Sequence, residues 1–460
     1  MKTFRCVTFG CRVNQYETQA IREQLEREGL SEAMPGEPAN IVMVNSCTVT
    51  EAADRDCLSQ LRLLHAENPL AKIVVTGCLV QRDAALLRDL PGIRLLVGTG
   101  QKHRIGEWVR SLIGPCQGSE TLMELELSRV YGSLQISRFD GREKAFVKVQ
   151  DGCDRACAFC KIPLVRGRSR SRELGEVLEE VRRLTDAGFR EVVLTGVAIG
   201  LWGKEFRSQR QLADLVRAVD RLPGRFRIRL SSLDPRDLDS SLLDILGSSS
   251  KLCRYLHLSL QSGSDPVLAR MNRGHTTAQY AGQLSALRRF WPDAGLTTDL
   301  IAGFPGETEE QFRQTLEFCQ EQRFAKVHVF PYSRRRGTSG ALFKEQLPAA
   351  VVRERARLLR QTADETARRF REPFVGTDQE ILVEKNGENC TSQFLRVRLE
   401  GEPGPAGELV PVRITGLTPG GLRAKILRDA LDKLTHLVPF LGWQYNLEQD
   451  PVTKANYRQR

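Results

Sequence analysis

The sequence predicts an α/β protein built from three parts. These are an N-terminal open parallel α/β sheet, a central partial barrel of about six β/α units, and a small C-terminal antiparallel β-barrel. Strand-like and helix-like segments alternate through the first 370 or so residues, an order that builds parallel sheets with helices on both faces. After Pro373 the segments become short, β-rich and divided by Gly and Pro, as in small barrels. The expected limits are 1–114, a linker at 115–138, 139–371, 372–428, and an unassigned tail at 429–460.

The first part shows four apolar strand segments with helical segments between them. Strands are expected at 3–9, 41–45, 72–76 and 94–97, and helices at 51–67 and 82–89. Asn14 and Glu17 have the spacing of a capping box, which predicts a helix that begins there and ends near Gly29.

Three cysteines follow the first three of these strands. Cys11 comes after the first strand, Cys47 after the second and Cys78 after the third. All strands of a parallel sheet end at one edge, where functional groups of open α/β folds gather. The pattern therefore predicts a site with three thiolates. The alternative is three small apolar residues at strand ends.

The central part contains six strand segments, each followed by a loop or helix. They are expected at 145–150, 191–195, 227–230, 256–260, 296–301 and 326–330, with a last helix at 353–371. A full or partial parallel barrel has its site at the carboxyl ends of the strands.

A second group of cysteines lies in the loop after the first barrel strand. Cys153, Cys157 and Cys160 form a C-x3-C-x2-C pattern. Thiolates hold iron–sulfur clusters, and three of them leave one iron of a four-iron cluster open to an outside ligand. The alternatives are incidental core cysteines or a zinc site, although zinc sites usually combine paired C-x2-C units.

Composition sets limits on the partners. The chain is 41% hydrophobic, and its apolar runs are far shorter than a membrane span. We expect a cytoplasmic protein whose 12 cysteines are ligands or reduced thiols. The net charge of +11 fits a polyanionic partner such as nucleic acid. The basic residues form three blocks: Lys161 with Arg166, Arg168, Arg170 and Arg172; 334–336; and 353–371, for which a solvated helix face is the alternative.

The Cys153 motif, with Phe159 before its last cysteine, resembles the signature of radical S-adenosylmethionine (SAM) enzymes. More of the chain resembles one branch of them, the methylthiotransferases. The segments that carry this resemblance are 8–18, 44–50, 76–81, 148–153, 257–264, 303–308 and 332–338, and the last part resembles the RNA-associated TRAM domain.

The resemblance implies two [4Fe–4S] clusters and S-adenosylmethionine as cofactors. Cys153, Cys157 and Cys160 would hold the radical cluster, and Cys11, Cys47 and Cys78 an auxiliary cluster. The implied cofactor contacts are Phe159, Gly196, Ser232, Gln261 and Asp299, although glycine and serine at strand ends also serve turns. No catalytic side chain is implied beyond the cluster ligands.

The resemblance also implies a substrate. The segment 10–18 looks most like the branch that methylthiolates C2 of N6-threonylcarbamoyladenosine beside the tRNA anticodon, although Arg12 stands where Lys is frequent. The alternatives are isopentenyladenosine in tRNA and a ribosomal-protein aspartate. The implied partners are the tRNA anticodon loop and an external electron donor such as flavodoxin or ferredoxin; the sequence does not identify the sulfur donor.

Two further expectations follow from charge and cysteine count. The barrel after Pro373 is roughly neutral, so RNA binding is expected to rest on Arg166 to Arg172 and on the arginines of 334–371. An iron–sulfur RNA-binding or electron-transfer protein is the alternative from another class, but purely redox clusters usually have four cysteine ligands.

Overall fold

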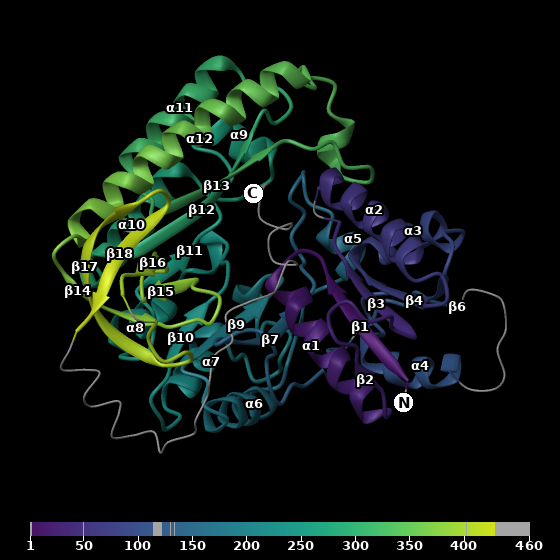
Figure 1. Ribbon diagram of the computed structural model, residues 1–460. Helices are drawn as coiled ribbons and strands as arrows, with labels where there is room; N and C mark the ends of the chain where they lie inside the picture. The colour runs from purple at the N-terminus through teal and green to yellow at the C-terminus, as the bar shows by residue number, and fades with distance from the viewer. Residues whose placement is uncertain are drawn as a thin grey trace.

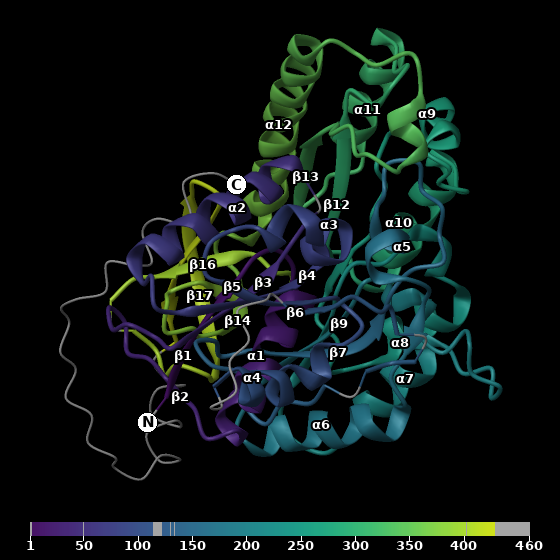
Figure 2. The same ribbon diagram turned by 90° about the vertical axis from the view of Figure 1, so that its right-hand side faces the viewer.

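The computed structural model describes residues 2–48, 50–113, 122–128, 130–132, 134–401 and 403–427. Figure 1 shows the N-terminal sheet on one side of the central barrel and the C-terminal barrel on the other, and Figure 2 views the molecule from the side of the N-terminal sheet. The tail 429–460 and Cys116 lie outside the described residues. Among the helices of the described ranges, none is long and apolar enough to cross a membrane.

The N-terminal part is a six-stranded sheet in the order β2-β1-β3-β4-β5-β6, and every pairing is parallel. Its strands are β1 (Thr3–Thr8), β2 (Ser31–Glu32), β3 (Ile41–Ser46), β4 (Lys72–Gly77), β5 (Ile93–Val97) and β6 (Leu122–Glu124). Its helices are α1 (Arg12–Arg27), α2 (Glu51–Glu67), α3 (Cys78–Arg88), η1 (Lys102–Arg104) and α4 (Ile105–Ile113). One apolar cluster joins the sheet to α2 and α3, and another joins it to α1 and α4. The predicted parallel α/β sheet is therefore confirmed.

Helix α1 begins earlier than the capping-box spacing predicts. Cys11 is its N-cap residue, and Asn14 and Glu17 lie inside its first turns, where both are buried. Asn14 Nδ2 donates to the backbone oxygens of Phe9 at 2.7 Å and Ser46 at 3.0 Å. The capping-box prediction is wrong, because these side chains serve tertiary contacts instead of the helix end.

The central part contains six parallel strands in the order β7-β9-β10-β11-β12-β13. β7, β9 and β10 form one sheet and β11, β12 and β13 another; parallel bridges from Ile228 to Leu252 and from Leu233 to Leu258 join them. The strands are β7 (Ala145–Asp151), β9 (Glu191–Gly196), β10 (Arg227–Leu230), β11 (Tyr255–His257), β12 (Gly295–Ala302) and β13 (Lys326–Pro331), with β8 (Arg170–Ser171) antiparallel on β7. No pairing of β7 with β13 joins the ends of the series, which confirms a partial barrel.

Helices cover the outside of the barrel (Figure 1). They are α6 (Leu174–Asp186), α7 (Leu212–Asp220), α8 (Ser240–Ser248), α9 (Asp265–Arg270), α10 (Thr277–Phe290), α11 (Glu309–Glu321) and α12 (Ala349–Arg371), with short turns η2 (Ile199–Leu201), η3 (Pro235–Asp237), η4 (Ser339–Leu342) and η5 (Glu372–Phe374). The short helix α5 (Ile162–Arg166) lies instead against α3 of the N-terminal part.

Helix α1 belongs to both the N-terminal sheet and the barrel. It packs against β7 and β9, and Tyr16 and Ala20 are part of the barrel's apolar core. The Tyr16 hydroxyl donates to the backbone oxygen of Leu134 at 2.7 Å. The two parts therefore share one core along this helix.

The C-terminal part is a closed five-stranded barrel in the order β14-β15-β16-β18-β17. Its strands are β14 (Asp378–Leu382), β15 (Asn389–Thr391), β16 (Arg396–Leu399), β17 (Leu409–Thr418) and β18 (Gly421–Ile426). The pairings are antiparallel except β16 with β18, which is parallel. The loop after β15 lies at the amino ends of the central strands, where the Arg254 amide donates to Ser392 Oγ at 2.8 Å and Arg229 Nη2 to Thr391 O at 3.1 Å.

Candidate functional site

The loop that carries Cys153, Cys157 and Cys160 is fixed by backbone hydrogen bonds. The Cys153 amide donates to Gly167 O at 3.0 Å, and the Cys160 amide donates to Cys157 O at 3.0 Å. Gly152 has a φ of +73°, and a Cβ there would lie 1.9 Å from Arg168 O. Only glycine fits this turn, so the strand end and the cysteines are held in a defined relation.

The three thiols influence one another electrostatically. Burial, together with a smaller effect of the Cys157 and Cys153 thiols, raises the pKa of Cys160 to about 12. Burial also raises the pKa of Cys153, and Cys157 adds to this rise. Neighbouring thiolates repel each other unless a cation lies between them, so this half-buried donor set suits a positively charged metal cluster.

Arg273 is a residue of this loop's surroundings that the sequence did not indicate. Its Nη1 lies 3.5 Å from Cys157 Sγ and 2.8 Å from Asp234 Oδ2, and its Nη2 donates to Ser259 O at 2.5 Å. Its only sequence signal is its place in a loop after α9, which does not distinguish it from other arginines.

The sheet brings Cys11, Cys47 and Cys78 to one edge. They follow β1, β3 and β4, which are neighbours in the sheet, and the register pairs Ser46 with Gly77. A Cβ on Gly10 would lie 2.6 Å from Cys47 Sγ, so the backbone before Cys11 passes directly over that thiol. Desolvation raises the pKa of the Cys11 thiol, Arg166 opposes this, and the Cys78 thiol adds to it.

Each set offers three thiols as possible metal ligands. Within the described part of the chain, no three His, Cys, Asp or Glu side chains are grouped as ligands of a single metal ion. An iron–sulfur cluster takes its cysteines on separate irons and so spreads them apart. The donor chemistry, three thiols per set without a fourth motif cysteine, fits such clusters.

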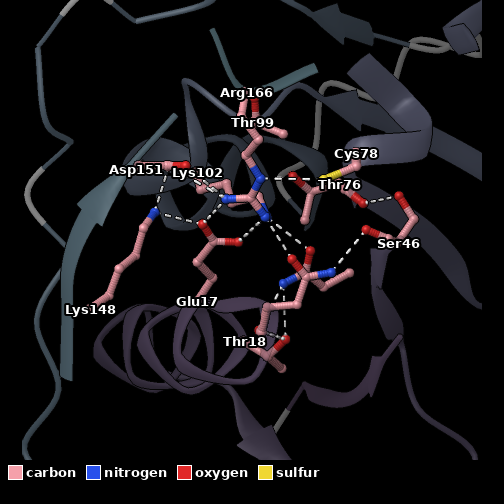
Figure 3. A network of polar contacts seen from close by, with 12 residues as sticks. Glu17, Thr18, Ser46, Thr76, Cys78, Thr99, Lys102, Lys148, Asp151 and Arg166 are labelled. Carbon is pink, nitrogen blue, oxygen red and sulfur yellow. Dashed lines mark hydrogen bonds and ion pairs between the residues drawn. The ribbon is translucent and has the colours of Figure 1, made fainter. Parts of the chain in front are cut away.

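Arg166 connects the two sets of cysteines (Figure 3). It ends α5, the short helix after Cys160, and α5 packs against α3, which begins at Cys78. Arg166 Nε donates to Cys78 Sγ at 3.3 Å, Nη1 to Glu17 Oε1 at 2.6 Å and Nη2 to Asn14 Oδ1 at 2.6 Å. The strand-end edge of the N-terminal sheet therefore faces the Cys153 loop.

A buried network of charges surrounds Glu17 (Figure 3). Lys148 Nζ lies 2.7 Å from both Glu17 and Asp151, and Lys102 Nζ lies 2.5 Å from Glu17. Burial alone would raise the pKa of Glu17, but Arg166, Lys102 and Lys148 hold it well below its usual range. The network locks the two parts of the molecule together with satisfied charges.

The first basic block does not form an RNA-binding surface. Arg166, Arg170 and Arg172 are buried, and they form ion pairs with Glu17, Asp151 and Glu180. The expectation that these arginines bind RNA is wrong, because their charges are neutralised inside the protein. Arg168, with a side chain 93% exposed, is the arginine of this block that faces solvent.

The expected cofactor contacts lie around the carboxyl ends of the barrel strands. Gly196 ends β9, Ser232 is exposed after β10, and Phe159 packs on the apolar cluster of Phe304 and Ile301. Gln261 has a φ of +82°. Its backbone forms a parallel bridge with Leu300 of β12. Its amide donates to Asp299 O at 2.8 Å, so the structure brings Gln261 and Asp299 together.

Polar side chains face one another between β11, β12 and β13. His257 Nε2 lies 3.1 Å from Asp299 Oδ2, and His257 Nδ1 lies 2.9 Å from Thr297 Oγ1. Burial would raise the pKa of Asp299, but His257 lowers it below its usual value. His328, 5.8 Å from His257 between ring centres, has its pKa lowered to about 4 by burial and then by Lys326. The sequence did not single out His328.

Two family models match the chain. Residues 147–319 match the radical SAM superfamily, and residues 3–98 match a family described as the uncharacterized protein family UPF0004. The first match covers β7 to α11 and includes the Cys153 loop, and the second covers the sheet with Cys11, Cys47 and Cys78.

Curated relatives cover most of the chain. The threonylcarbamoyladenosine tRNA methylthiotransferase MtaB of Bacillus subtilis (strain 168) is 34% identical, over 90% of this chain and 94% of its own. MtaB of Thermotoga maritima is 36% identical, over 84% and 87%. The tRNA-2-methylthio-N6-dimethylallyladenosine synthase of Aquifex aeolicus is 33% identical, over 93% and 99%.

A solved structure supports the fold. The radical SAM methyltransferase TsrM of Kitasatospora setae, with cobalamin and a [4Fe–4S] cluster bound, aligns with a TM-score of 0.52 at 16% identity. The alignment covers 72% of this chain and 74% of that one.

Proposed function

The chain belongs to the radical SAM family of tRNA methylthiotransferases, and we propose that it methylthiolates C2 of N6-threonylcarbamoyladenosine beside the anticodon. As a member of this family it is a transferase of sulfur-containing groups that acts on tRNA and uses S-adenosylmethionine with a [4Fe–4S] cluster. The observation that carries the proposal is the pair of three-cysteine sets joined by Arg166.

Each cysteine set has a separate role in this proposal. Cys153, Cys157 and Cys160 hold the radical cluster, and Cys11, Cys47 and Cys78 hold an auxiliary cluster. When bound, these groups supply radical cleavage of S-adenosylmethionine at one site and a sulfur to be methylated at the other. Arg166 supports the geometry by fixing the radical loop against the Cys78 side of the sheet.

The strand ends provide the cofactor pocket. Phe159, Gly196, Ser232, Gln261 and Asp299 lie at or near the carboxyl ends of barrel strands, where barrel enzymes bind their ligands. We assign them to S-adenosylmethionine, with Gln261 and Asp299 as the pair whose backbones are in direct contact.

The substrate assignment is supported by the names of the relatives. MtaB proteins are described as threonylcarbamoyladenosine tRNA methylthiotransferases and match at 34% to 38% identity. The dimethylallyladenosine synthases match at 32% to 33%, so isopentenyladenosine is the second candidate. The third candidate is a ribosomal-protein aspartate.

The proposal includes a setting for the reaction. The target is the tRNA anticodon loop, the electron comes from an external donor such as flavodoxin or ferredoxin, and the compartment is the cytoplasm.

The proposed domains of the chain are 1–114, 139–371 and 372–428, with 115–138 as linker. The three separate sheet systems support this division.

Deletion of the gene tests the substrate. Mass spectrometry of tRNA nucleosides should show loss of 2-methylthio-threonylcarbamoyladenosine, and a plasmid copy should restore it. If this nucleoside persists while methylthiolated isopentenyladenosine or a methylthiolated ribosomal aspartate disappears, the substrate is wrong. Anaerobic protein reduced with dithionite should form 5′-deoxyadenosine from S-adenosylmethionine; an iron–sulfur protein that only carries electrons would form none.

A further inference from the structure

Arg12 extends from the N-terminal part toward the open side of the barrel. It is half-buried and directly follows Cys11 at the start of α1. Its guanidinium carbon lies 6.0 Å from the ring centre of Phe146 on β7, and its charge lowers the pKa of His328 on β13. Because β7 and β13 are the two ends of the parallel series and do not pair with each other, Arg12 lies where the barrel is incomplete.

Phe394 forms the other side of this region. It belongs to the C-terminal barrel and has a φ of +65°, a backbone conformation that is costly for a bulky residue. Three cations lie over its ring, with charge-to-centre distances of 4.7 Å for Arg229, 5.4 Å for Arg12 and 5.6 Å for Lys144. The ring therefore connects the C-terminal barrel to a cluster of positive charge.

Two of these three cations have carboxylate partners. Lys144 Nζ lies 2.7 Å from Glu384, and Arg229 Nε lies 2.8 Å from Glu191. For Arg12, the described residues provide a cation–π contact but neither a carboxylate nor another hydrogen-bond acceptor. A half-buried guanidinium with five unused N–H donors is suited to an anionic ligand.

The ionisable groups described next do not neutralise the positive charge of Arg12. Asp299, the carboxylate on β12, accepts from His257 at 3.1 Å and from Ser259 at 3.3 Å. Burial holds the pKa of His328 near 4, so this imidazole is neutral at physiological pH. A second cation, Arg142, lies 5.7 Å from the Phe146 ring and adds to the positive potential.

We propose that Arg12 binds the carboxylate of the threonylcarbamoyl group and thereby selects this nucleoside over one with an uncharged side chain. The inference rests on the proposed function, and it assigns substrate specificity to one residue of this chain. A planar guanidinium matches a carboxylate with two parallel hydrogen bonds. An isopentenyl group would leave Arg12 desolvated without a partner, which penalises that substrate. Arg12 directly follows Cys11, so its backbone lies at the proposed sulfur-carrying site while its guanidinium reaches toward Phe146 and Phe394.

The test compares two synthetic anticodon stem–loops. One carries N6-threonylcarbamoyladenosine and the other its uncharged threoninamide analogue, and kcat/KM is measured for methylthio product with loaded enzyme. Wild type should prefer the carboxylate by at least about tenfold. Arg12→Gln should lose this preference, mostly through KM, and Arg12→Lys should keep part of it.

Two controls separate recognition from packing. Arg104→Gln removes a cation that lies 5.0 Å over the Trp108 ring on the N-terminal part, and it should leave the preference unchanged. Iron content and the urea midpoint should be equal in wild type and Arg12→Gln, which shows that the variant is folded and loaded.

The proposal is overturned if wild type uses both stem–loops equally. It is also overturned if Arg12→Gln loses activity on both by the same factor, since Arg12 would then only support the fold. Failure of the proposed function gives a different result: wild type would modify neither of these RNAs but would modify an isopentenyladenosine stem–loop.

Discussion

Arg166 Nε donates to Cys78 Sγ at 3.3 Å, so a side chain of the barrel contacts a cysteine of the N-terminal sheet. The same guanidinium forms an ion pair with Glu17 at 2.6 Å in the interior. Loss of one partner from a buried charge network leaves the others uncompensated. The contact therefore serves stability and also the electronic environment of Cys78.

Replacement of Arg166 should destabilise the protein strongly. We expect Arg166→Met to lower the free energy of unfolding by about 3–5 kcal/mol in urea denaturation, because Glu17 and Asn14 each lose one buried partner. Arg168→Met, which removes an exposed arginine two positions further on, should cost less than about 1 kcal/mol.

In loaded protein Arg166→Met should also lower the reduction potential of the auxiliary cluster, because Cys78 Sγ loses its hydrogen-bond donor. Equal stability of the two variants would contradict the role of this network.

Single cysteine variants should separate the two proposed sites. Cys157→Ala should abolish 5′-deoxyadenosine formation, and Cys47→Ala should still form it but yield no methylthio product. Cys319→Ala, a buried thiol on α11 without a ligand motif, is the matched control and should retain both activities. Liquid chromatography with mass spectrometry measures both products. Full product from Cys47→Ala would refute the auxiliary site.

A methyl group on Gly152 should disrupt the radical loop. Gly152→Ala combines a φ of +73° with a Cβ 1.9 Å from Arg168 O, so the loop has to move. We expect loss of iron from the Cys153 set and at least about a tenfold fall in 5′-deoxyadenosine formation. Gly141→Ala has a similar φ of +71° but no heavy atom within 4 Å of the added carbon. It should cost only about 1–2 kcal/mol of backbone strain and keep its iron. Similar iron content in both variants would contradict this reading.

Acid should destabilise the protein through the buried charge network around Asp151. Lys148, Arg166 and Arg170 lower the pKa of Asp151 to about 2 against the opposing effect of burial. A depressed native pKa gives stability that is present above the unfolded pKa of about 4 and is lost as pH falls toward 2. This contribution of Asp151 to the free energy of unfolding is on the order of 2 kcal/mol.

Urea denaturation between pH 2 and 6 measures this loss (roughly the range in which carboxylates titrate). Asp151→Asn should be less stable at pH 6 but should show a shallower decline toward pH 2. If both proteins decline with the same slope, Asp151 does not contribute to the acid sensitivity.

RNA affinity should depend on helix α12. Arg353 and Arg360 are exposed and seven residues apart, so they share one helix face, and neither has a carboxylate partner among the described residues. The double variant with Gln at both positions should weaken tRNA binding and reduce the slope of log affinity against log salt by about 1.5, which is the loss of two phosphate contacts. Fluorescence anisotropy over a salt series measures this. Gln at Arg357 and Arg369, which pair with Glu354 and Glu365, should change the slope less.

The cysteine positions could be predicted because strand ends of a parallel sheet share an edge. Cys11, Cys47 and Cys78 required only the strand order, and the structure places them just after the ends of neighbouring strands. Glu17 could not be predicted in the same way. Its spacing from Asn14 imitates a capping box, and its partners Lys102, Lys148 and Arg166 are 85 to 149 residues away. Local pattern carries no information on such pairs.

The basic block after Cys160 failed as a prediction for the same reason. A run of arginines without acids reads as a surface for polyanions, yet Arg172 is buried against Glu180 and Arg170 against Asp151. The parallel pairing of β16 with β18 was also beyond sequence pattern, because an alternating strand looks the same in either direction.

Helix α1 has a mechanical consequence. Tyr16 and Ala20 are packed in the barrel core while Cys11 caps the same helix, so a movement of Cys11 away from the barrel would open that core. The spacing between the two proposed clusters is therefore set by side-chain packing and not by a hinge.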